Sequence, residues 1–424
     1  MRILKIKKII LLTGIIFSVL YVNASRLLIP MDKTQTNHLK AYGIAYWVLS
    51  QEIEVSWLLN YQGGSFLCPY SEKIAKECAL RGVSCKVLAD VQSEAILAEI
   101  AQADVNMSEI KLNKAPKIAV YSPKSKLPWD DAVTLVLTYA EIPYEVLYDE
   151  EIISGVLPMY DWLHLHHEDF TGQYGKFWSR YRNATWYIDD VKMQENTAKK
   201  LGFSKVSQLK LAVVKKIRDF VGGGGYMFAM CSAPDSYDVA LAADGVDICD
   251  VPFDGDPIDP QAQSKLNFDN TFAFYNFKLS LNPYEYEISD INVNPNIHFA
   301  NEKSDFFTLF EFSAKWDPVP TMLCQSHYQV IRGFMGQTTA FRRDKVKPNV
   351  VILGETKSFD EVRYLHGSFG KGTFTFLGGH DPEDYQHYVG DPPTDLNLHP
   401  NSEGYRLILN NVLFPAAKKE KQKT

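Results

Sequence analysis

Residues 207–243 of this chain, SQLKLAVVKKIRDFVGGGGYMFAMCSAPDSYDVALAA, contain the pattern that decides the fold. Apolar side chains recur at helical spacing from Leu209 to Phe220, and the glycines at 222–225 end that helix. The apolar run at 226–230 is typical of a buried parallel strand, and a second helix follows it. This order of helix, strand and helix predicts an α/β sheet.

Cys231 lies at the turn between that strand and the second helix. The small residues Ala229 and Ala233 stand two positions to either side, as a tight strand-to-helix turn around a nucleophile requires. Ser232 is expected to cap the helix, with Asp235 completing a capping box. The positive end of the helix dipole favours a thiolate at this place. Cys231 is therefore a candidate nucleophile, and an inert buried thiol and a metal ligand are the alternatives.

Strands and helices alternate through much of the chain. We expect helices at 130–142, 207–221 and 404–413, and strands at 117–121, 144–148, 160–165, 226–231, 350–353, 361–364 and 373–377. This alternation predicts a doubly wound, mostly parallel, flavodoxin-like sheet. Because ligands bind at the carboxyl ends of parallel strands, the residues that end these strands should share one rim.

Changes in composition divide the chain into segments. We expect a signal peptide at 1–24, a smaller N-terminal α/β domain at 25–113, the main domain at 117–249 with 350–415, a mostly β insertion at 250–349, and a basic tail at 416–424. The insertion is predicted from short aromatic or β-branched runs at 272–281, 284–288, 306–312 and 321–323.

The first 24 residues predict export. Basic side chains precede an apolar run at 9–22, and Val22-Asn23-Ala24 forms a small-x-small cleavage site. The apolar run is shorter than the roughly 20 residues that a membrane span needs. We therefore expect a periplasmic or extracellular protein with no integral membrane span after cleavage. An uncleaved N-terminal anchor is the alternative.

Composition restricts the class of partner. The 424 residues carry a net charge of −7, which gives no reason to expect a nucleic acid. We expect a small-molecule, peptide or glycan ligand instead, and no organic cofactor, because no nucleotide-binding fingerprint is present. Among the 6 cysteines, Cys78 and Cys85 are close enough in sequence to pair, and Cys68 is another candidate. The sequence leaves this pairing open.

A histidine follows the last predicted strand. His380 comes after a glycine pair, and we expect it on the same rim as Cys231. A catalytic thiol needs a base within hydrogen-bond reach and a carboxylate that orients the base. His380 is the candidate base, and Asp381 or Glu383 is the candidate orienting group. A polar turn with a locally bonded histidine is the alternative.

Residues 164–169, HLHHED, hold the densest cluster of possible metal ligands. In an extended strand His164, His166 and Glu168 share one face, so these residues are a candidate divalent-metal site. Alternatively, this segment lines a substrate pocket. The predicted pocket residues are Ser122, His166, His167, Glu168 and Asp169.

The segments 117–249 and 350–415 resemble class I glutamine amidotransferase-like domains. The resemblance rests on the strand-Cys231-helix turn and on a final strand that delivers His380, followed by Pro382-Glu383. It implies a Cys-His-carboxylate triad that hydrolyses amide side chains. The chain has alanines where the family has glycines around the cysteine, and Asp381 interrupts the family's His-Pro-Glu pattern.

The whole chain resembles an exported bacterial family that carries the name asparagine synthetase B. The stretches that carry this resemblance are LKAYGIAYWVL at 39–49, YDWLHLHHEDFTGQYGKF at 160–177, KWDPVPTML at 315–323 and GGHDPEDYQHYVGDPPTDLNLHPNS at 378–402. Synthetase activity itself is not expected. Arg2, and not a cysteine, follows Met1, and the Ser-Gly-Gly-x-Asp-Ser loop that binds ATP is missing.

These patterns together favour an exported amidotransferase-like protein with a cysteine-dependent amidase or related hydrolase site. Two alternatives belong to other classes. One is a non-catalytic glycan- or peptide-binding protein on a degenerate amidotransferase-like fold. The other is a metal-dependent hydrolase centred on His164, His166 and Glu168.

Overall fold

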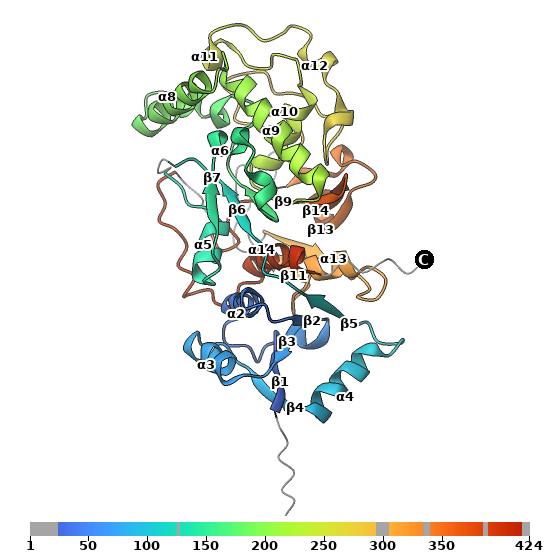
Figure 1. Cartoon of the computed structure of the whole chain (residues 1–424). Coiled ribbons are helices and arrows are strands. Elements are labelled where there is room, and N and C mark those ends of the chain that lie inside the picture. The colour runs from blue at the N-terminus through green and yellow to red at the C-terminus, as the bar shows by residue number, and fades with distance from the viewer. Residues whose placement is uncertain are drawn as a thin grey trace, which may run out of the picture.

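The computed structural model describes residues 24–124, 128–293, 305–332, 334, 340–384 and 389–417. The predicted signal peptide, apart from its last residue, and most of the predicted basic tail lie outside these ranges. The chain folds as a mixed α/β protein with a larger and a smaller sheet (Figure 1). Within the described ranges, no helix combines the length and the apolar character that crossing a membrane requires.

The N-terminal segment forms the smaller sheet, whose strands run antiparallel in the order β4-β1-β3-β2-β5. Its elements are β1 Ala24–Ile29, α2 His38–Ser50, β2 Val55–Leu59, β3 Ser65–Pro69, α3 Glu72–Leu80, β4 Lys86–Ala89, α4 Asp90–Ala101 and β5 Ser108–Leu112. Helix α2 also packs against α5 (Ala132–Tyr139) and α14 (Glu403–Leu413). One apolar core therefore continues from the smaller sheet to the larger one.

The larger sheet has 10 strands, in the order β11-β10-β13-β14-β15-β9-β8-β6-β7 with β12 paired to β14. The central and distal strands are β6 Ile118–Tyr121, β7 Glu145–Leu147, β8 Trp162–Leu165, β9 Tyr226–Met230, β13 Val351–Thr356, β14 Glu361–Phe369 and β15 Gly372–Leu377. Strands β15, β9, β8, β6 and β7 are parallel to their neighbours in this run.

The prediction of a mostly parallel sheet is wrong for the other half. Strands β13, β14 and β15 pair antiparallel. Only Gly370 and Lys371 lie between β14 and β15, and a link this short can join only antiparallel strands. The larger sheet is consequently mixed.

Helices cover both faces of the larger sheet. Val120 and Phe228 point into the core shared with α5 and α14, whereas Ala119 and Met227 point into the core on the opposite face. That second core contains helices α9 (Val206–Gly223) and α10 (Ala233–Ala242). The chain also forms helices α6 Asp149–Ser154, α7 Trp178–Tyr181 and α8 Thr185–Lys200. Burial on both faces explains why these strands are apolar without alternation.

The described part of residues 250–349 contributes strands to the edge of the larger sheet and short helices outside it. These elements are α11 Val251–Asp254, α12 Ala262–Lys265, β10 Phe306–Leu309, α13 Pro318–Leu323, β11 Val330–Arg332 and β12 Phe341–Arg342. The predicted strand at 321–323 is wrong, because Pro318 starts a helical turn there. The run at 272–281 forms isolated bridges at Phe274 and Leu279 and no strand, and the run at 284–288 forms neither a bridge nor a strand.

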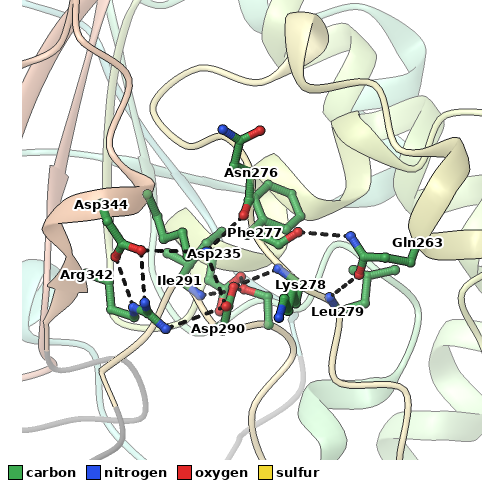
Figure 2. Close-up of polar contacts among 12 residues, drawn as sticks. Asp235, Gln263, Asn276, Phe277, Lys278, Leu279, Asp290, Ile291, Arg342 and Asp344 are labelled. Atoms are coloured by element: carbon green, nitrogen blue, oxygen red, sulfur yellow. Dashed lines mark hydrogen bonds and ion pairs between the residues drawn. The ribbon is translucent and has the colours of Figure 1, made fainter.

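Two buried carboxylates of α10 hold this segment against the helix that follows Cys231. Asp238 accepts hydrogen bonds from the backbone N–H groups of residues 272, 273 and 274, at 2.7, 2.8 and 2.8 Å. Asp235 accepts one from the Ser289 hydroxyl at 2.8 Å, beside the contacts drawn in Figure 2. Burial raises the pKa of Asp235 to about 7. The segment is thus anchored directly to the candidate site.

Candidate functional site

Cys231 occupies the turn between β9 and α10 in a left-handed backbone conformation, with φ of 54°. Few residues other than glycine adopt this conformation, and it is typical of a nucleophile on a strand-to-helix turn. The backbone N–H of Cys231 donates to the carbonyl of Gly379 at 3.0 Å, which joins the ends of β9 and β15. Gly379 has φ of 98°, and an added Cβ would meet the Phe334 carbonyl oxygen at 1.6 Å. Only glycine fits there.

The capping box predicted for α10 is wrong. The Ser232 side chain makes no cap hydrogen bond, and Asp235 bonds to Ser289. The first turn of α10 instead donates to successive carbonyls of the segment after β8. These bonds are Ala233 N–H to His166 at 3.0 Å, Ser232 Oγ to His167 at 3.1 Å and Ser236 Oγ to Glu168 at 2.9 Å. They fix the HLHHED segment beside Cys231.

The structure brings four residues from three strand ends together: His166, His167, Cys231 and His380. One potential ligand atom from each lies within 4.8 Å of the others. The rings of His166 and His167 stack at 3.8 Å between centroids, and each lies 4.6 Å from the His380 ring. All except His167 are buried. The carboxyl ends of parallel strands produce this convergence.

Asp130 is the carboxylate next to His380. Nε2 of His380 lies 3.2 Å from the Asp130 carboxylate. The two candidates named from sequence bond elsewhere: Asp381 accepts from the Tyr405 hydroxyl at 2.6 Å, and Glu383 lies 3.2 Å from His399. The carboxylate within hydrogen-bond distance of His380 is thus Asp130, which sequence reasoning missed.

Asp131 joins two histidines of the HLHHED segment. One carboxylate oxygen lies 3.3 Å from His164 and 3.2 Å from His166, while the other caps α5 by accepting from the Thr134 N–H at 2.9 Å. Although burial raises the pKa of Asp131, the two imidazoles hold it well below its usual range. Among the described residues, Asp131 thus takes the place predicted for Glu168 beside His164 and His166.

The remaining predicted pocket residues have other surroundings. Asp169 accepts from the backbone N–H and hydroxyl of Thr171 at 2.7 and 2.6 Å and from Gly175 N–H at 3.0 Å, which shapes the loop after β8. Burial raises the pKa of Glu168 to about 8 although Lys210 opposes the shift. Ser122 lies at the end of β6, and its N–H donates to Leu147.

Aromatic side chains extend from the site toward the surface. The Trp129 ring lies 5.8 Å from His167, 5.3 Å from Phe177 and 5.2 Å from Trp186. Phe177 in turn lies 5.6 Å from Tyr286. These rings are partly exposed, so they can contact a bound molecule.

A separate cavity of about 670 Å³ lies between the 278–293 segment and residues 359–361. Three of its charged residues pair with one another (Figure 2): Arg342 bonds Asp344 at 3.0 and 2.9 Å and lies 3.6 Å from Asp290. Asp290 also accepts from the Lys278 N–H at 2.6 Å. Because Arg342, Asp344 and Asp290 already pair with one another, this cavity is a weaker candidate than the cysteine site.

The sequence signals only part of the role that Asp130 and Asp131 have at the site. Asp131 is the second residue of the predicted helix at 130–142, and a helix-capping aspartate is favoured at the start of a helix. The sequence holds no signal that its carboxylate also reaches His164 and His166. That contact exists only because β6 and β8 are neighbours in the sheet.

No family model matches the chain, and no curated protein matches it. The chain is similar to the cytoplasmic protein STM3548 from Salmonella typhimurium at 10% identity, over 69% of this chain and 97% of that one, with a TM-score of 0.32. It is also similar to the cytoplasmic protein STM1381 from Salmonella typhimurium LT2, at 13% identity over 71% of this chain and 100% of that one, with a TM-score of 0.35. The similarity to Gan42B, a GH42 beta-galactosidase, is 11% identity over 63% of this chain and 28% of that one, with a TM-score of 0.27. These scores are too low to support an inference about function.

Proposed function

We propose that this chain is an exported, cysteine-dependent hydrolase of the amidase type on an amidotransferase-like fold. The observation that carries the proposal is Cys231, held with φ of 54° and with a His380 nitrogen within 4.8 Å of its sulfur. A left-handed conformation costs a residue with a side chain about 1–2 kcal/mol. Such strain persists chiefly where function requires it.

The fold part of the proposal is supported by the arrangement of the parallel strands. Strands β15, β9, β8, β6 and β7 run side by side with helices on both faces, and the cysteine and histidine follow β9 and β15. This is the placement that the resemblance to class I glutamine amidotransferase-like domains implies.

The residues at the site have distinct roles in the proposed reaction. The Cys231 thiol gives its proton to His380, and the thiolate attacks the carbonyl carbon of an amide. The C–N bond breaks, and the leaving amine takes the proton from His380. Water then hydrolyses the thioester and regenerates the thiol. Asp130 is a positioning residue that holds the imidazole.

Ammonia release from a panel of primary amides, including glutamine and asparagine, tests this function. We expect turnover by the wild-type chain and a loss of about 1,000-fold or more in Cys231→Ala. Cys249→Ala is the matched control, because Cys249 is also buried but bonds to the Thr171 carbonyl away from His380. Turnover that survives in Cys231→Ala would contradict the proposal.

A second candidate is a binding protein for glycans or peptides, which the aromatic group around Trp129 favours. Trp129, Phe177 and Trp186 present partly exposed rings next to His167. Aromatic faces stack on sugar rings and on apolar side chains. Oligosaccharide binding that changes tryptophan fluorescence equally in wild type and Cys231→Ala, without turnover, would favour this candidate.

A further inference from the structure

We infer that the protein binds a divalent transition-metal ion of the zinc class through His166, His167, Cys231 and His380, and that the bound ion blocks the Cys231 thiol. Metal binding stands by itself. The blocking effect rests on the proposed function. This ligand set shares only His166 with the set predicted from sequence. Glu168 is not part of it, and His164 contacts Asp131 instead.

The donor atoms are close to the spacing that zinc requires. Zinc bonds of about 2.0–2.3 Å in a tetrahedron place ligand atoms roughly 3.3–3.8 Å apart. The atoms of this group already lie within 4.8 Å of one another, so side-chain shifts of about 1 Å close the site. Three imidazoles and one thiol are a ligand set that suits zinc and not magnesium or calcium.

Each imidazole has an oxygen within 3.2 Å of one of its two nitrogens. His167 Nε2 donates to the Asp130 carbonyl at 2.7 Å, and His380 Nε2 lies 3.2 Å from the Asp130 carboxylate. His166 Nδ1 lies 3.2 Å from the Asp131 carboxylate. In a neutral imidazole bonded in this way the second nitrogen carries a lone pair, the arrangement that supports metal-bound histidines.

An independent observation concerns His166. The residue is 1% exposed, and its Nε2 has no hydrogen-bond partner among the described residues. Burying such an atom without a partner costs free energy, which a metal bond would recover. His167 is the partly exposed member of the group and gives an ion access from solvent.

The charges at the site after metal binding follow from the protonation states of its ligands. The Cys231 thiol releases its proton to solvent and binds as thiolate, while the histidines bind as neutral imidazoles. The complex then carries one positive charge beside the carboxylates of Asp130 and Asp131. A sulfur bonded to zinc is not available as a nucleophile, so metal removal would be required for thiol chemistry.

The test uses the full chain, stripped of metal by a chelator, and zinc chloride or cobalt chloride as probe. We expect one equivalent of zinc to remain after desalting, and a thiolate-to-cobalt charge-transfer absorption with Co²⁺. Cys231→Ser should remove that absorption, and Asp131→Asn should lower zinc affinity about 10- to 100-fold. Cys249→Ser is the control, because Cys249 belongs to a different group with Asp247 and Asp254.

The outcomes separate this inference from the proposed hydrolase. Absence of stoichiometric zinc, or a cobalt absorption that is lost in Cys249→Ser and kept in Cys231→Ser, would overturn the metal site. Zinc that binds but leaves iodoacetamide labelling of Cys231 unchanged would overturn the blocking effect. If zinc binds to Cys231 but the metal-free thiol supports no turnover, the hydrolase fails and the metal site stands.

Discussion

The Asp130 carboxylate lies 3.2 Å from Nε2 of His380, although 250 positions separate the two residues in the chain. Asp130 precedes α5, and His380 follows β15. The parallel strands β6, β8, β9 and β15 lie side by side, and both residues lie beyond the carboxyl ends of these strands. This contact orients the imidazole that lies next to Cys231.

Asp130→Asn tests which carboxylate orients His380. We expect amide turnover to fall about 100- to 10,000-fold with the fold intact, because the amide no longer favours the required imidazole tautomer. Asp381→Asn is the matched variant, since Asp381 bonds to Tyr405 and not to His380. Equal losses in the two variants, at unchanged circular dichroism, would refute the assignment of Asp130.

The left-handed backbone at Cys231 should make a glycine variant more stable than an alanine variant. Glycine adopts φ of 54° without strain, whereas alanine pays about 1 kcal/mol there. We therefore expect Cys231→Gly to unfold at higher denaturant concentration than Cys231→Ala. At an ordinary helical position the order is reversed. A glycine variant that is less stable than the alanine variant would show that the turn is not strained.

The Asp238 carboxylate predicts a stability effect in the segment packed on α10. Asp238→Asn leaves at least one of the N–H groups of residues 272–274 without an acceptor, so the free energy of unfolding should fall by about 2–4 kcal/mol. Burial raises the pKa of Asp238 to about 6, so the measurement belongs at pH 8. Asp269→Asn on the exposed surface of the same segment is the control and should be neutral within about 0.5 kcal/mol.

Buried His366 should make the folded protein less stable in acid. Burial lowers its pKa from 6.5 to about 4. Between these values the unfolded chain binds the proton more tightly than the folded chain, so stability is lost as the pH falls from 6.5 toward 4. The slope contributed is at most about 1.4 kcal/mol per pH unit. His366→Gln should flatten it in denaturant titrations across this range, while the other histidines contribute equally to both proteins. Parallel curves would contradict the prediction.

The sequence predicted local elements better than long-range pairing. The helices near α9 and α14 and the strands near β6, β8 and β9 follow from apolar periodicity and from glycine, which act within a few residues. The antiparallel half of the larger sheet depends on the short link at 370–371 and on pairing choices that periodicity does not encode. The same limit applies to the predicted strand at 321–323, where Pro318 favours a helical turn.

For the candidate site, sequence reasoning named four residues that each follow an expected strand: His166, His167, Cys231 and His380. It did not name Asp130 or Asp131, because carboxylates before a helix are common caps, and their contacts with histidines arise from the order of strands in the sheet.

The rate at which iodoacetamide labels Cys231 in metal-free protein at neutral pH, followed by peptide mass spectrometry, tests the central claim most directly. Burial raises the pKa of the Cys249 thiol well above its usual value, which makes Cys249 an internal reference. We expect iodoacetamide to label Cys231 at least about 10-fold faster than Cys249, and the labelling rate of Cys231 to decrease clearly in His380→Gln. Labelling of Cys231 that is as slow as that of Cys249, or unaffected by loss of the imidazole, would contradict the account.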